Sequence, residues 1–139
     1  MNDADFSLVE KQLYEKATSI RKKAYAPYSR FKVGASILSD VGIHIGANVE
    51  NASYGCTSCA EASAISDMIK EGGTSIRLIC VSGDADGPVT PCGNCRQRIR
   101  EFATKDTEVH MVNGKGELQM ISTLETLLPY SFGPESLLS

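Results

Sequence analysis

The sequence contains no apolar run long enough to cross a bilayer and no positively charged leader. A membrane-spanning helix needs about 20 consecutive apolar residues, and no uninterrupted apolar stretch of this chain approaches that length. The chain opens with Met1-Asn2-Asp3-Ala4-Asp5, which carries acid where a secretory signal carries positive charge. We therefore expect a protein of the cytoplasm that does not associate with membranes.

A stripe of basic residues is also missing. Lys and Arg are scattered along the chain and the formal net charge is -3, whereas polynucleotide binding requires clustered positive charge. Nucleic acid is therefore not an expected partner. There is no low-complexity tract and no internal repeat, and 139 residues with 42% apolar content are ordinary for one compact domain. We expect a single domain over residues 1–139.

Cysteines are few, and nothing in the sequence indicates export. The five cysteines are therefore expected to be reduced thiols rather than a disulfide framework. Three of them stand in two short motifs, Cys59-Ala60-Glu61 and Pro91-Cys92-Gly93-Asn94-Cys95. A structural zinc normally has four protein ligands, whereas a catalytic zinc has three and leaves one position to water. Three thiolates and a free carboxylate predict a catalytic zinc site with Glu61 available to move protons.

Hydrophobic spacing predicts five strands and four helices. Apolar residues three or four apart over residues 6–24 predict a helix that begins with a capping box of Ser7 and Glu10. The predicted strands are 32–39, 43–48, 76–82, 109–113 and 117–121. Further helices are predicted to begin near Cys59, at Pro91, and at a capping box of Ser122 and Glu125. This order predicts an α/β fold in which helices cover a mixed sheet.

Both cysteine motifs lie at predicted helix starts, where free N–H groups and the helix dipole favour negative charge. Two other interpretations stay open. Cys56-Thr57-Ser58-Cys59 is a second C-x-x-C, so the two pairs could form a closed four-cysteine zinc site, and the thiols could also be small buried hydrophobes. The 32 residues between Cys59 and Cys92 exceed the roughly 15 to 20 common in zinc ribbons, which favours the catalytic site.

The chain resembles the small homotetrameric cytidine deaminases over nearly its whole length. The resembling blocks stand in family order at 24–29, 31–35, 48–54, 59–61, 91–97 and 127–129. A C-x-x-C pair with a non-ligating Glu is the constellation of zinc deaminases. The resemblance implies a three-layer α/β/α cytidine-deaminase-like fold with a mixed five-stranded sheet.

The resemblance also implies the activity. Cys59, Cys92 and Cys95 would bind one Zn²⁺ per subunit, and Glu61 would shuttle protons as water attacks C4 of the pyrimidine. The implied reaction converts cytidine and 2'-deoxycytidine to uridine and 2'-deoxyuridine with release of ammonia, in pyrimidine salvage. A modified or drug-like cytosine nucleoside is the alternative substrate, and a structural four-cysteine zinc module is the non-enzyme alternative.

Four residues are implied to contact the substrate. Asn48 and Glu50 match family residues that hold the ribose hydroxyls, Phe31 matches an aromatic placed against the base or sugar, and Ala60 would offer backbone groups to the base. Without the resemblance, Asn48 and Glu50 would be interpreted as surface residues at a strand end. Phe31 would be assigned to the core.

Two aromatic residues are implied to complete the active site of a neighbouring subunit. Phe132 resembles the family aromatic that reaches a neighbour's base, and Tyr54 lies at the same implied boundary. The resemblance therefore implies a homotetramer with composite active sites. For Tyr54, a buried hydrophobic residue at an interface is the other interpretation.

One position departs from the family pattern. Many members have Arg directly after the catalytic Glu, where it donates to the cysteine sulfurs, but this chain has Ala62. Arg98 follows Cys95 by about one helical turn and is a candidate replacement, although it could equally be a solvated surface residue. Cys56 and Cys80 lie outside the ligand positions, and we expect both thiols to be buried or partly buried.

Overall fold

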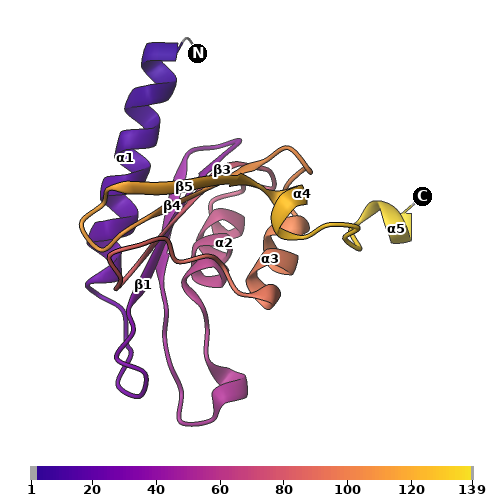
Figure 1. Cartoon of the computed structure of the whole chain (residues 1–139). Coiled ribbons are helices and arrows are strands. Elements are labelled where there is room, and N and C mark those ends of the chain that lie inside the picture. The colour runs from indigo at the N-terminus through magenta and orange to yellow at the C-terminus, as the bar shows by residue number, and fades with distance from the viewer. Residues whose placement is uncertain (1–2, 139) are drawn as a thin grey trace.

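The computed structural model describes residues 3–138, which fold around one five-stranded sheet (Figure 1). The strands are β1 (Val33–Ser39), β2 (Ile43–Ala47), β3 (Ile76–Gly83), β4 (Glu108–Val112) and β5 (Leu118–Thr123). Their order in the sheet is β2-β1-β3-β4-β5. β3 and β4 pair in parallel and the other neighbours are antiparallel, so the prediction of a mixed five-stranded sheet is confirmed.

Helices cover both faces of the sheet. They are α1 (Asp3–Arg21), α2 (Ala60–Lys70), α3 (Gly93–Arg100), α4 (Leu124–Leu127) and α5 (Glu135–Leu138), with a 3-10 turn η1 at Tyr54–Cys56. α1 lies on one face, and α2 and α3 lie on the other (Figure 1), which confirms the three-layer α/β/α arrangement. None of the helices within residues 3–138 has the length and apolar character that a membrane span requires.

The alternation of side chains along β3 explains why helices can pack on both faces of the sheet. Successive side chains of a strand point to opposite faces. Leu78 and Cys80 pack with Leu13 of α1, whereas Ile79, between them, joins the core that includes Met68 of α2. All five side chains are fully or almost fully buried. A central strand that is apolar on both faces therefore separates two cores.

Two glycines let the covering helices approach the sheet backbone closely. A Cβ atom on Gly34 of β1 would lie 2.1 Å from the carbonyl oxygen of Ala17 in α1. A Cβ atom on Gly46 of β2 would lie 2.4 Å from the backbone nitrogen of Ala64 in α2. Both distances are far shorter than van der Waals contact, so any side chain would push these helices away. The position of α2 therefore depends on Gly46.

Two predicted helix starts are wrong. α1 begins at Asp3, so the predicted capping box of Ser7 and Glu10 lies inside the helix and does not start it. α4 is capped by Thr123 rather than by Ser122, because the Thr123 side chain accepts a hydrogen bond from the first turn. Adjacent hydroxyl residues satisfy the same sequence pattern, and only the backbone conformation decides between them.

Candidate metal and substrate site

The starts of α2 and α3 bring sulfur and carboxylate groups together. Cys59 is the N-cap of α2, and Glu61 lies in its first turn. Cys92 is the N-cap of α3, and Cys95 lies one turn further on. The Cys59 sulfur, the Cys95 sulfur and a carboxylate oxygen of Glu61 lie within 4.8 Å of one another. Two segments more than 30 residues apart in the sequence therefore form one cluster.

Cys92 lies beside this cluster rather than in it. Its side chain is exposed and lines the same cavity as Cys59 and Cys95. The structure thus brings together two of the three predicted zinc ligands with Glu61 and puts the third at the cavity wall. The three-sulfur ligand set stays a prediction. The donor set suits zinc, which binds thiolates and carboxylates, and two helix N-termini favour the negative charge of these groups.

The four-cysteine alternative has no geometric support. Cys56 belongs to η1 and is exposed. Within residues 3–138, the metal-competent group of three side chains does not include it. The expectation that Cys56 would be at least partly buried is wrong, since η1 contains no buried residue. Cys80 is buried in β3, as expected.

The environment shifts the ionisation of the cluster. Burial first, and then the neighbouring charge of Cys59, raise the pKa of Glu61 to about 7. The pKa of Cys59 is lowered to about 6, first by a hydrogen bond from the Cys95 thiol and also by the N–H group of Ala62 and by Arg98. The pKa of Cys95 is raised, first by that bond to Cys59 and then by burial. The Cys59 sulfur is therefore the thiolate of the pair.

A cavity of about 320 Å³ opens beside the cluster. Its lining includes four residues that the sequence predicts to contact substrate, namely Phe31, Asn48, Glu50 and Ala60. The remaining lining residues are Ser29, Val33, Thr57, Val81, Val89 and Thr90 together with Cys59, Glu61, Cys92 and Cys95. Among the described residues that line it, none is Lys or Arg. The lining is thus partly apolar and carries two acidic side chains, Glu50 and Glu61, without a cationic lining residue.

Asn48 is held on both sides of its amide. Its Oδ1 accepts from the backbone N–H of Val33 (2.8 Å), and its Nδ2 donates to the carbonyl oxygen of Phe31 (3.0 Å). The side chain thus ties the end of β2 to the segment that carries Phe31. Each polar atom of the amide retains capacity for one more hydrogen bond.

Glu50 is held from the segment before β1. Its carboxylate accepts from the backbone N–H groups of Tyr28 (3.0 Å) and Ser29 (3.1 Å) and from the Ser29 hydroxyl. These bonds, first of all the one from the Ser29 hydroxyl, keep the pKa of Glu50 below its usual value. Sequence reasoning missed Ser29 as a site residue. The signal that could have found it is its place in the block 24–29, next to the predicted Phe31.

Tyr54 and Phe132 do not line the cavity that contains the cysteines. Tyr54 is 83% exposed, and Phe132 is 58% exposed. Tyr54 lines an adjoining cavity of about 440 Å³ that shares Ser29, Glu50 and Thr57 with the first. Phe132 lies in the segment before α5, where its carbonyl oxygen accepts from the Gln97 side chain (2.9 Å). Neither aromatic ring is therefore brought to the site of its own chain.

Arg98 reaches the cluster from α3. Its Nη1 lies 3.3 Å from the Sγ of Cys59 and donates a hydrogen bond to it, although the side chain is otherwise exposed. The predicted proximity to a cysteine sulfur is thus present in the structure. The sulfur is that of Cys59 on α2, not that of Cys95 on the same helix as Arg98.

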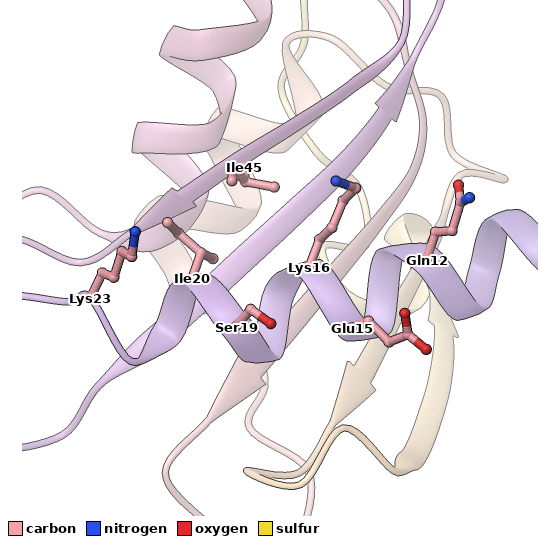
Figure 2. A pocket seen from close by; sticks show the side chains of 7 residues that line it. All are labelled: Gln12, Glu15, Lys16, Ser19, Ile20, Lys23 and Ile45. Atoms are coloured by element: carbon pink, nitrogen blue, oxygen red, sulfur yellow. The ribbon is translucent and has the colours of Figure 1, made fainter.

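A larger cavity lies elsewhere and carries none of this chemistry. It measures about 460 Å³ and lies along α1 beside Ile45 of β2, where Figure 2 shows lysine, glutamate, glutamine and serine side chains around it. Its lining contains no cysteine and no residue predicted to take part in the site. The smaller cavity is the candidate site because it joins titratable groups with shifted pKa values to an apolar wall.

Known proteins resemble this chain over most of its length. Residues 8–111 match the family described as cytidine and deoxycytidylate deaminase zinc-binding region. A cytidine deaminase of Sporosarcina psychrophila is 42% identical over 130 residues, which are 93% of this chain and 94% of that protein. One from Halalkalibacterium halodurans is 45% identical over 126 residues, covering 90% and 95% respectively. The crystal structure of cytidine deaminase from Burkholderia pseudomallei matches with a TM-score of 0.80 at 41% identity, over 87% of this chain and 97% of that one.

Proposed function

This chain belongs to the cytidine and deoxycytidylate deaminase family, and we propose that it is a zinc-dependent enzyme that hydrolyses cytidine and 2'-deoxycytidine to uridine and 2'-deoxyuridine with release of ammonia. The observation that carries this proposal is the cluster of Cys59, Glu61 and Cys95 at the wall of a cavity of about 320 Å³. A nucleophile-activating centre and a space for a small substrate thus occur in one place. Relatives that align with 87% to 93% of this chain at 41% to 45% identity are cytidine deaminases.

Each polar group of the cluster has a proposed role. Cys59, Cys92 and Cys95 would hold one zinc ion, and their thiolates suit it. When bound, zinc supplies Lewis acidity that makes water nucleophilic at neutral pH. Glu61 does not act as a ligand in this proposal. Its carboxylate accepts a proton from the attacking water and delivers protons to N3 of the pyrimidine and to the leaving amine.

The burial of Glu61 supports that role. A carboxyl group with a pKa of about 7 exists in both protonation states near neutral pH, so it can act as base and then as acid. An exposed carboxyl with an ordinary pKa would stay ionised and would return protons poorly. Glu61 is only 4% exposed, which also keeps bulk water from competing for its proton.

The cavity lining supports a nucleoside substrate. Asn48 and Glu50 would bind the ribose hydroxyls, because an amide and an ionised carboxylate together offer donor and acceptor groups. Phe31 would pack against the base or sugar, and Ala60 would offer backbone groups to the base. A phosphate group would meet the carboxylates of Glu50 and Glu61 without a cation in the lining, so a nucleotide is disfavoured. A modified cytosine nucleoside remains the alternative substrate.

The assembly and setting complete the proposal. We infer one domain, because two cores share one sheet. We also infer that the protein is a homotetramer and that it acts in pyrimidine salvage in the cytoplasm. Tyr54 and Phe132 would contact the site of a neighbouring subunit. Their high exposure in the single chain supports this role, because large aromatic side chains are costly to leave in water.

The decisive experiment follows the absorbance of cytidine during incubation with zinc-loaded protein. We expect the absorbance to fall as ammonia appears, the activity to disappear after chelation, and zinc to restore it. A panel with 2'-deoxycytidine, deoxycytidylate and cytosine nucleosides substituted at N4 or C5 ranks the substrates. Unchanged cytidine, or equal turnover after complete zinc removal, would contradict the proposed function. A preference for deoxycytidylate would contradict only the choice of nucleoside over nucleotide.

A further inference from the structure

Helix α3 carries three arginines, and each contacts a different part of the structure. Arg96 donates to two backbone carbonyl oxygens, each at 2.7 Å, which tie the start of α3 to the end of α4. Arg100 is buried and binds a hydroxyl and a carboxylate of the C-terminal segment. Arg98 has no oxygen partner in the described part of the chain, and it donates a hydrogen bond to the Sγ of Cys59 at 3.3 Å. α3 therefore holds two neighbouring segments in place through Arg96 and Arg100, and it contacts the candidate metal site through Arg98.

The Cys59 sulfur accepts from two nitrogens. The backbone N–H of Ala62 donates to it from the first turn of α2 at 3.4 Å, which is an ordinary helix-capping contact. The guanidinium of Arg98 donates from α3, and this bond crosses between the two helices that supply the predicted ligands. The side chain of Ala62 has no donor of its own, so Arg98 is the cationic side chain that bonds this sulfur among the described residues.

We propose that Arg98 is a positioning residue for the metal site, which holds the Cys59 sulfur between α2 and α3 and withdraws electron density from it. This inference rests on the zinc site of the proposed function. It adds a residue that tunes that site without touching substrate. Within residues 3–138 Arg98 has no hydrogen bond to an oxygen, and its partners are cysteine sulfurs of the cluster, which favours a role at the metal site over a purely structural one.

The charges explain why such a donor matters. Three thiolates around Zn²⁺ leave a net charge near -1, and each thiolate pushes electron density onto the metal. A hydrogen bond from a charged donor to a ligand sulfur lowers the energy of its lone pairs and weakens that push. The metal then stays more electrophilic. Outer-shell partners of this kind typically change metal affinity by about 10- to 100-fold.

The test compares Arg98→Met, which keeps an unbranched side chain and removes every N–H donor, with Arg98→Lys, which keeps a charge and a donor. Lys105→Gln is the matched control, since Lys105 is an exposed cation beyond the end of α3 whose side chain has no hydrogen bond or ion pair in the described part of the chain. Each protein is prepared with cobalt in place of zinc, and the sulfur-to-cobalt charge-transfer band is recorded. Zinc loss to a chelator is timed in parallel.

We expect the band of Arg98→Met to move to longer wavelength, because the sulfur lone pairs rise in energy when the donor is removed. Zinc loss should become roughly tenfold faster. Arg98→Lys should fall between wild type and Arg98→Met in both measurements, and Lys105→Gln should match wild type. Since Arg98 is exposed, the metal-free forms of all variants are expected to retain the melting temperature of the metal-free wild type.

Two results would overturn the inference about Arg98. One is an Arg98→Met band at the wild-type wavelength, even if zinc loss is faster, because the sulfur would then not sense the donor. The other is an equal shift in Lys105→Gln, which would mean that the loss of any positive charge moves the band, without a specific hydrogen bond. A wild-type protein without any sulfur-to-cobalt band would instead refute the metal site of the proposed function, and that outcome is separable because it does not depend on the Arg98 variants.

Discussion

Replacing Glu61 by Gln removes proton transfer while almost preserving shape. Glu61 is 4% exposed at the start of α2, so a smaller residue would also leave a cavity and confuse the result. A pKa of about 7, raised first by burial, lets the Glu61 carboxyl both take and give a proton near neutral pH. Gln can neither take nor give that proton. The full contribution of a general acid and base is therefore lost.

That contribution is typically about 10²- to 10⁴-fold in rate, which corresponds to roughly 3 to 5 kcal/mol of transition-state stabilisation. We expect kcat/KM for cytidine to fall by at least about 10²-fold in Glu61→Gln, while the zinc content stays at one per chain. The assay combines initial rates from cytidine absorbance with elemental analysis of the same sample. Glu71→Gln, at the exposed C-terminal end of the same helix, is the control and should keep wild-type rates.

The turnover and the zinc content of Glu61→Gln together decide the role of this carboxylate. Near-normal turnover by zinc-loaded Glu61→Gln would mean that another group moves the protons. Loss of zinc together with loss of activity would show that the carboxylate acts as a ligand, a role compatible with its oxygen lying within 4.8 Å of both sulfurs. Either outcome would refute the role proposed for Glu61.

Three further predictions follow from the fold and the site. Cys56→Ser should retain zinc because this exposed thiol lies outside the cluster, and metal release from that variant would revive the closed four-cysteine site. Gly46→Ala should destabilise the protein by about 1 to 3 kcal/mol, since its Cβ would meet the backbone of α2. Calorimetry should find a melting temperature at least about 3 °C lower, and an unchanged value would refute the close approach. Phe132→Ala should raise KM for cytidine in the assembled protein, and a fully active monomer in sedimentation and rate measurements would contradict composite sites.

Local chemistry decided most of what the sequence predicts correctly. Cys59 and Cys92 are the N-caps of α2 and α3, close to the predicted helix starts near Cys59 and at Pro91, where backbone N–H groups need acceptors. Strand positions are also close to the prediction, since alternation and β-branched residues act over a few neighbours. The cysteine motifs themselves indicated Glu61, and the order of the elements indicated helices on a mixed sheet. The resemblance added the three-layer arrangement and the site residues Asn48 and Glu50, which would otherwise have been interpreted as surface residues at a strand end.

What the sequence could not predict depends on packing between distant segments. The hydrogen bond from Arg98 goes to Cys59 and not to Cys95, because the relative placement of α2 and α3 decides which sulfur lies within reach. Burial of Cys56 was expected from its residue type, but η1 projects without buried contacts. The helix α5 was not predicted, as four residues give too little periodicity to detect.

The two hydrogen bonds that Asn48 makes with the main chain have a consequence for engineering sugar selectivity. An aspartate there would turn an oxygen toward the carbonyl of Phe31, which now accepts a hydrogen bond from Nδ2, and two acceptors would repel each other. A longer or shorter side chain would release Val33 as well. Redesign of position 48 therefore requires redesign of the start of β1 at the same time. Libraries that vary position 48 alone will mostly yield misplaced loops.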